Sequence, residues 1–307
     1  MKITDLTQVA KTVATRAIKK TIQFLMSNYL YMIWFVIYFT FAWYMFGMDF
    51  QAFRTVAIIY GGSVAVALSP IGEYILRLFK NCRLPATSEE KNYLLPLFEE
   101  VFENAKEIDP KLNNDIALYI MDDMHVNTMA VGRKTIAITR GAIATFSADE
   151  LKGILAHEVG HMTFGHTKAL LLTVIGNFLF TAIIWFLRLI LIVIEFLLGL
   201  VEHKHILFKI LKFMTVAIKF IIDIAVMLFI HLSEIILALN SRANEIQADV
   251  FAYEVGYGNE LISGLYLLQK ISINGNVTIL ERMKASHPHI AHRIENIELL
   301  EDGEIDE

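Results

Sequence analysis

The sequence predicts a mainly α-helical membrane protein with about four transmembrane helices and a cytoplasmic α+β domain that holds a small antiparallel sheet. The first observation behind this fold class is composition, because the 307-residue chain is 55% hydrophobic with a mean hydropathy of +0.51, more apolar than soluble domains usually are. The second is that the long apolar runs come in two pairs. The third is that amphipathic and strand-like patterns fill the polar stretch after each pair.

Charge and cysteine content narrow the classes of function. The formal net charge is -5 and no Lys/Arg cluster alternates with aromatic residues, so nucleic acid is not expected as a partner. Cys82 is the one cysteine, which excludes an intramolecular disulfide and a site built from thiolates. Any metal ion would therefore be bound by histidines and carboxylates.

The first pair of apolar runs predicts a transmembrane hairpin within residues 1–80. The run at 29–48 carries no charge and is long enough to cross a hydrocarbon core of roughly 30 Å, and a second span is expected at about 55–76. A cleaved signal peptide would have a shorter apolar region. Lys and Arg flank the hairpin on both sides, whereas its loop has only Arg54. We therefore expect a multi-pass protein of the cell inner (plasma) membrane, in contact with the lipid bilayer, with residues 81–168 in the cytoplasm.

A second hairpin is expected over residues 169–239, in runs from Ala169 to Val201 and from about Ile206 to Leu239. Charged residues interrupt both runs, and charges at membrane depth usually pair or face protein. They include Arg188, Glu195, Lys219 and Asp223. Their spacing allows pairing within one helix or across the two spans, and it leaves a proton or ion path open as the alternative.

The polar stretch between the hairpins predicts two helices and a sheet. Apolar residues recur at helical spacing from Ser88 to about Lys106. Ser147 and Glu150 have the spacing of a capping box, so a helix is expected to begin there and to run through His161. Three short runs rich in strand-forming residues lie between these helices and predict the antiparallel sheet: Ile116–Met121, Thr128–Val131 and Thr135–Thr139.

Residues 240–307 predict the other half of the cytoplasmic domain. Three helical patterns are expected, at Asn240–Glu254, Leu261–Ile271 and Ile290–Leu300. An acidic tail follows the last of them.

His157, Glu158 and His161 form an H-E-x-x-H motif. On a helix the i, i+4 spacing places both imidazoles on one face, where both can bind one Zn²⁺ through nitrogen. Glu158 is offset around the same turn, which makes it the candidate general base for a zinc-activated water. The pattern also arises by chance in chains rich in His and Glu, so it needs support from a second segment.

Glu245 and Asp249 supply that support. Glu245 is the candidate third ligand, and Asp249, one helical turn further on, is the candidate partner for the other ring N–H of a ligand histidine. A shared metal requires that His161 and Glu245 lie on the same side of the bilayer, and the two intervening spans satisfy this. A solvated helical carboxylate remains the alternative for Glu245. Arg242 and His287 are candidates to donate to the oxyanion, although His287 also fits an ordinary turn before proline.

These residues together resemble a known family. The motif at 157–161, the block Ser241–Asp249 and Ser286-His287-Pro288 are similar to the gluzincin membrane peptidases, namely the bacterial HtpX family and the zinc CAAX prenyl proteases. The resemblance covers about residues 127–293. It implies one Zn²⁺ per chain on the three proposed ligands, Glu158 as the base, and a role in membrane-protein quality control. It also implies a substrate chain that pairs with an edge strand near Asn127. Four spans look like HtpX, whereas CAAX proteases have more.

Two departures from the family pattern stand out. Thr128 and Met129 follow the asparagine, where the family often has a small residue and an aromatic one. Phe164-Gly165-His166-Thr167 follows the metal motif, where HtpX proteins often have Asn-Gly-Asp, and is closer to the CAAX relatives. On a continuing helix His166 lies about 140° around from His161, so a residue at the membrane surface is expected rather than an extra ligand.

The leading hypothesis is therefore a zinc metalloendopeptidase that cleaves membrane or misfolded proteins at the cytoplasmic face. One alternative is a CAAX-type protease acting on prenylated peptides. An alternative of another class is a noncatalytic membrane receptor or ion-conducting protein with a structural metal, which the charges within the spans motivate.

Overall fold

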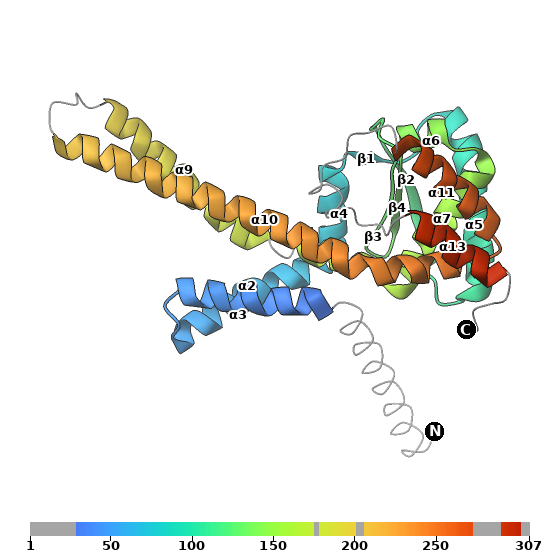
Figure 1. The fold of residues 1–307 in the computed structure, drawn as a ribbon, viewed down its shortest axis with the longest axis horizontal. Coiled ribbons are helices and arrows are strands. Elements are labelled where there is room, and N and C mark those ends of the chain that lie inside the picture. The colour runs from blue at the N-terminus through green and yellow to red at the C-terminus, as the bar shows by residue number, and fades with distance from the viewer. Residues whose placement is uncertain (1–28, 175–177, 201–205, 273–289, 302–307) are drawn as a thin grey trace, which may run out of the picture.

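Two helical hairpins project from one side of an α+β domain in the computed structural model, which describes residues 29–174, 178–200, 206–272 and 290–301 (Figure 1). The longer hairpin consists of α9 and α10, and the shorter one of α2 and α3. Residues 81–168 and the C-terminal part of the chain build the domain together, because α10 returns from the hairpin into it.

The N-terminal hairpin comprises α2 (Tyr29–Met45) and α3 (Phe50–Ala67). The second predicted span is divided, because α3 ends at Ala67 and α4 (Pro70–Phe79) begins three residues later. Ser69 caps α4 by accepting a hydrogen bond from the N–H of Ile71, and Pro70 occupies the first turn, where its missing N–H costs nothing. The apolar run that predicted the second span is therefore divided between α3 and α4.

One helix in the described part of the chain, α3, is long and apolar enough to cross a bilayer by length and composition. The apolar segment Met32–Tyr44 within α2 is shorter. The number of spans, predicted as four, is therefore not confirmed and stays a prediction.

The longer hairpin begins after α8 (Thr167–Val174) and comprises α9 (Phe178–Leu200) and α10 (Ile206–Glu254). The separate helix predicted at 240–254 is instead the end of α10, which continues unbroken for 49 residues. Four of the charged residues in the hairpin pair between its two helices, Arg188 with Asp223 and Lys219 with Glu195. This supports the structural pairing expected for these four residues. The pairs form across the two helices and not within one helix.

The sheet is mixed, so the prediction of an antiparallel sheet was wrong. Its strands are β1 (Cys82–Arg83), β2 (Ala117–Met121), β3 (Thr128–Val131) and β4 (Thr135–Thr139), in the order β1-β2-β4-β3. β3 and β4 are antiparallel as expected, but β2 pairs with β4 in parallel. Every residue of β4 is buried, so this strand takes the inner position, whereas half of β3 is only partly buried and lies at the edge. Burial therefore decided a strand order that local patterns do not encode.

The helices predicted for the domain are confirmed, with small shifts at their ends. They are α5 (Ser88–Ile108), α7 (Ala148–Phe164), α11 (Gly258–Ser272) and α13 (Ile290–Glu301). The predicted capping box of Ser147 and Glu150 begins α7. The short helix α6 (Arg140–Thr145) and the two-residue strand β1 were not predicted.

Helix α7 lies at the centre of the domain, against α5, α10, α11 and β3. Leu151, Leu155 and Val159 fill the core around it. Two glycines allow close approach of neighbouring backbone: a Cβ on Gly153 would lie 2.3 Å from the nitrogen of Leu261, and one on Gly160 would lie 3.1 Å from Ala248 Cα. The metal motif is thus on a helix whose position is fixed from several sides.

Candidate metal centre

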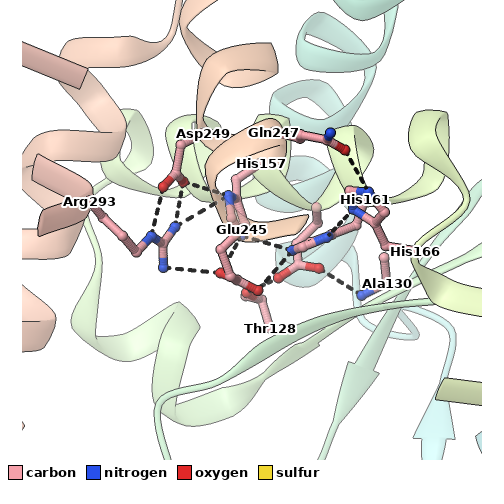
Figure 2. A network of polar contacts seen from close by, with 10 residues as sticks. Thr128, Ala130, His157, His161, His166, Glu245, Gln247, Asp249 and Arg293 are labelled. Carbon is pink, nitrogen blue, oxygen red and sulfur yellow. Dashed lines mark hydrogen bonds and ion pairs between the residues drawn. The ribbon is translucent and has the colours of Figure 1, made fainter. Parts of the chain in front are cut away.

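Three predicted ligands from two helices meet at one point. His157 and His161 project from α7, and Glu245 projects from α10 (Figure 2). One donor atom from each of the three lies within 4.8 Å of the other two. Because 83 residues and both hairpin helices separate His161 from Glu245, the return of α10 creates this cluster.

The donor atoms are close enough to share one metal ion, and each histidine is near a different oxygen of Glu245. His157 Nε2 lies 3.1 Å from His161 Nε2 and 3.4 Å from Glu245 Oε2, and His161 Nε2 lies 3.3 Å from Glu245 Oε1. Ligands at the usual zinc distances of about 2.0–2.1 Å are separated by about 3.3 Å along a tetrahedral edge. Two imidazoles and one carboxylate are also a donor set that suits zinc. The residues present therefore fit the ion.

Glu158 is buried beside the cluster, but its carboxylate contacts strand β3 instead of joining the ligands. Its Oε1 accepts the hydroxyl of Thr128 at 2.8 Å, and its Oε2 accepts the N–H of Ala130 at 2.7 Å. Figure 2 labels the two partners, Thr128 and Ala130. The carboxylate is therefore held by strand β3, while its helix also carries the two histidines of the cluster.

Asp249 is hydrogen-bonded to a proposed ligand, as the sequence predicted. His157 Nδ1 donates to Asp249 Oδ1 at 2.8 Å, which orients the ring so that Nε2 points at the cluster. Arg293 holds the other side of this carboxylate, with Nη2 and Nε at 2.6 and 2.8 Å from its two oxygens. The same guanidinium lies 3.4 Å from Glu245 Oε2.

The ionisation of this group follows from its surroundings. Burial and the charge of Arg293 lower the pKa of His157, but the carboxylates of Asp249 and Glu245 outweigh them and raise it to about 9. Burial raises the pKa of Asp249, but hydrogen bonds from Arg293 and His157 leave it below its ordinary value. Asp249 is therefore an anion, and protons compete with a metal ion for His157.

The edge strand β3 is held in place at its C-terminal end, where it turns into β4. Its turn to β4 is bound by Glu73 of α4, whose carboxylate accepts the N–H groups of Arg133 and Lys134 and the hydroxyl of Thr135. Thr167 donates to the carbonyl of Gly132 in the same turn. The strand that contacts Glu158 is thus tied to the helix that follows the N-terminal hairpin.

The predicted residues do not all enter this cluster. Asn127 precedes β3, and its backbone N–H and carbonyl are bonded to Thr139 of β4. β3 lies at the edge of the sheet, as a strand-pairing substrate would need. The backbone of Arg242 is part of α10, but its side chain and all of His287 lie outside the described residues. Their roles remain predictions.

Arg293 is a residue of this cluster that the sequence did not lead us to expect. It lies in α13 one residue before Ile294, on a helix whose buried positions also include Ile297. An arginine among the apolar positions of an amphipathic helix indicates a buried ion pair, because such a charge is rarely buried unpaired. The sequence contained this signal, but not the identity of the partner.

A helix-borne H-E-x-x-H motif joined by a glutamate from a second helix defines the class of a metallopeptidase. The model of Peptidase family M48 matches residues 89–301, and the chain belongs to this family. Within it, the chain is an HtpX-like protease and a metalloendopeptidase.

The chain is similar to proteins named Protease HtpX over most of its length. Protease HtpX of Shewanella baltica (strain OS185) is 28% identical over 255 residues, covering 78% of this chain and 85% of that protein. Protease HtpX of Shewanella oneidensis is 27% identical over the same length. Among solved structures, Ste24p of S. mikatae matches with a TM-score of 0.44 and 21% identity, and the match covers 93% of this chain and 66% of that one.

Proposed function

We propose that this chain is a zinc-dependent endopeptidase that hydrolyses membrane or misfolded proteins at the cytoplasmic face of the cell membrane, in membrane-protein quality control. The observation that carries the proposal is the convergence of His157, His161 and Glu245 within 4.8 Å, with Glu158 beside them. The alternative of a noncatalytic protein is set aside, because the chain belongs to a peptidase family.

Each residue then has a role in peptide hydrolysis. Zinc, when bound to His157, His161 and Glu245, supplies a Lewis acid that acidifies water and polarises a carbonyl. Glu158 accepts the proton from the attacking water and returns it to the leaving amine. Arg242 and His287 remain the candidates to donate to the oxyanion. The outer edge of β3, next to Asn127, is the proposed site of pairing with an extended substrate, a mode that tolerates many sequences.

The membrane location is supported by the surface of the hairpins. Large apolar side chains of α9 and α10 are exposed along both helices, among them Trp185, Phe196, Phe213 and Phe220. An exposed apolar surface of this extent is typical of contact with lipid or protein. Pairing of Arg188 with Asp223, and of Lys219 with Glu195, lowers the cost of placing these charges in an apolar environment.

The decisive experiment compares the wild type with Glu158→Gln, each purified in detergent. Glu107→Gln, on an exposed carboxylate of α5, is the matched control. We expect one zinc per chain in all three proteins by elemental analysis, and loss of proteolysis by roughly 10²–10⁴-fold in Glu158→Gln alone. Cleavage retained by Glu158→Gln would refute the role of the base. Turnover that requires a prenyl group on the substrate would favour the CAAX-type alternative.

Sidedness is tested separately with single cysteines on a Cys82→Ser background. Glu107 lies in the domain and Met48 in the loop between α2 and α3, and both are exposed. An impermeant thiol reagent added to intact cells is expected to label Met48→Cys and not Glu107→Cys, whereas permeabilised cells label both. Labelling of Glu107→Cys in intact cells would place the domain outside the cytoplasm.

A further inference from the structure

His166 contacts the ring nitrogen of His161 that does not point at the ligand cluster. His166 Nδ1 lies 3.1 Å from His161 Nδ1, and His166 Nε2 lies 3.1 Å from Gln247 Oε1. Figure 2 shows the three side chains in a row that connects the end of α7 with α10. The row thus joins the two helices that provide the proposed ligands.

The end of helix α7 brings His166 to this position. Gly165 caps the helix in the left-handed conformation, with φ 75°, and the N–H of His166 donates to the carbonyl of His161 at 3.0 Å. The chain therefore folds back over the last turn of the helix. The expectation that His166 lies away from His161 was wrong because it assumed that the helix continues.

The contacts permit one assignment of protons if His161 binds a metal. The Nε2 atom of His161 is the one in the cluster and carries no proton as a ligand, so Nδ1 carries the proton and donates it to His166 Nδ1. His166 must then carry its own proton on Nε2, which donates to Gln247 Oε1. His161 therefore donates to the neutral imidazole of His166, and His166 donates to the side-chain amide oxygen of Gln247.

We propose that His166 and Gln247 are positioning residues of the metal centre, which hold His161 in the tautomer and orientation that present Nε2 to the ion. This inference rests on the proposed zinc site. The two ligand histidines then have different supports, since His157 is held by the ionised pair of Asp249 and Arg293, and His161 by two neutral side chains. His166 itself is no ligand, because both of its ring nitrogens are engaged by His161 and Gln247.

The two residues are expected to contribute unequally to zinc binding. Loss of a residue that orients a metal-binding histidine typically costs 10–100-fold in affinity. We expect a loss of that size for His166→Leu, because this variant leaves the Nδ1–H of His161 without its acceptor. We expect about a threefold loss for Gln247→Leu, because Gln247 is exposed and water can replace its amide.

The experiment measures zinc affinity by competition with a chromophoric chelator, using the full-length chain in detergent. Thr163→Val is the matched control, since Thr163 lies between the two histidines and its buried hydroxyl has no hydrogen-bond partner among the described residues. A second measurement records the visible spectrum of the Co²⁺-loaded proteins, which reports ligand geometry at the ion. A third measures the thermal unfolding of the metal-free proteins.

The expected result is weaker binding and an altered Co²⁺ spectrum for His166→Leu, with wild-type behaviour for Thr163→Val and equal unfolding temperatures without metal. Unchanged affinity and spectrum in His166→Leu would overturn the inference, as would a fall in metal-free stability with no change in affinity. Loss of all binding at saturating zinc would also overturn it, since His166 would then be a ligand. If the wild type itself binds no zinc, the proposed function fails instead.

Discussion

The metal centre and the α9–α10 hairpin both contain charges paired between helices, but their burial differs. The side chains of Arg293 and Asp249 are 5% and 2% exposed, whereas those of Arg188 and Asp223 are 35% and 36% exposed. In the centre the pair also fixes the ring of His157. In the hairpin, Arg188 pairs with Asp223 and lies over the ring of Trp185 in its own helix, so the pair serves to neutralise charge on apolar helices. An ion pair between helices therefore orients a side chain of the candidate site in the domain. In the hairpin the same kind of pair lowers the cost of placing charges on apolar helices.

The largest expected effect breaks the buried pair. Arg293→Met leaves Asp249 buried without its guanidinium, which is expected to lower the free energy of unfolding by about 3–5 kcal/mol. Arg188→Met in the hairpin is expected to cost about 1 kcal/mol. Denaturant titration of both variants in the same detergent measures the difference. Equal losses would show that burial does not distinguish the two pairs.

A smaller effect on stability is expected from the packing of the two regions. Gly153→Ala places a Cβ 2.3 Å from the backbone nitrogen of Leu261, so α7 and α11 must separate at a cost of about 1–3 kcal/mol. At Gly199 in α9 a Cβ would meet no atom within 4 Å, and Gly199→Ala is expected to be neutral or stabilising by up to about 1 kcal/mol. Thermal unfolding compares the two, and a destabilised Gly199→Ala would contradict this assignment of close and open packing.

The two regions can also be compared by the effect on catalytic activity of removing one threonine hydroxyl from each. Thr128→Val removes the hydroxyl that binds Glu158 and is expected to lower kcat about tenfold with little change in KM. Thr128→Ser keeps the hydroxyl and is expected to restore most of kcat. Thr215 in α10 donates to the carbonyl of Leu211 in its own helix, so Thr215→Val is the control. Loss of activity in Thr215→Val, or full activity in Thr128→Val, would argue against a specific role of Thr128.

A partly buried pair of the domain, Arg83 with Glu90, provides the third case and the smallest effect. Hydrogen bonds from Arg83 hold the pKa of Glu90 at about 2, below its ordinary value. A depressed pKa contributes stability above the pKa of the unfolded state, and this contribution is lost as the pH falls from about 4.3 towards 2. Unfolding measured over this range is expected to show a shallower loss in Glu90→Gln than in the wild type. Identical acid dependence would indicate that the pair contributes nothing measurable.

Local patterns predicted most of the elements, because helix caps and apolar periodicity act over a few residues. Ser147 and Glu150 begin α7 as the capping-box spacing indicates, and the spacing of His157 and His161 fixes their common face on that helix. Glu245 was reached by a similar argument, since its spacing to Asp249 on a helical segment follows from the pattern. These properties belong to single segments, so the sequence alone determined them.

Tertiary structure decided the properties that depend on partners distant in the chain. β4 lies between β2 and β3 because burial of the whole strand outweighs the adjacency of neighbours in sequence. Arg293 meets Asp249 only because α13 packs against α10, and His166 meets Gln247 only because Gly165 turns the chain at the end of α7. The sequence around a buried charge or imidazole does not identify its partner. Any suitable group that the fold brings near can offset the cost of burial.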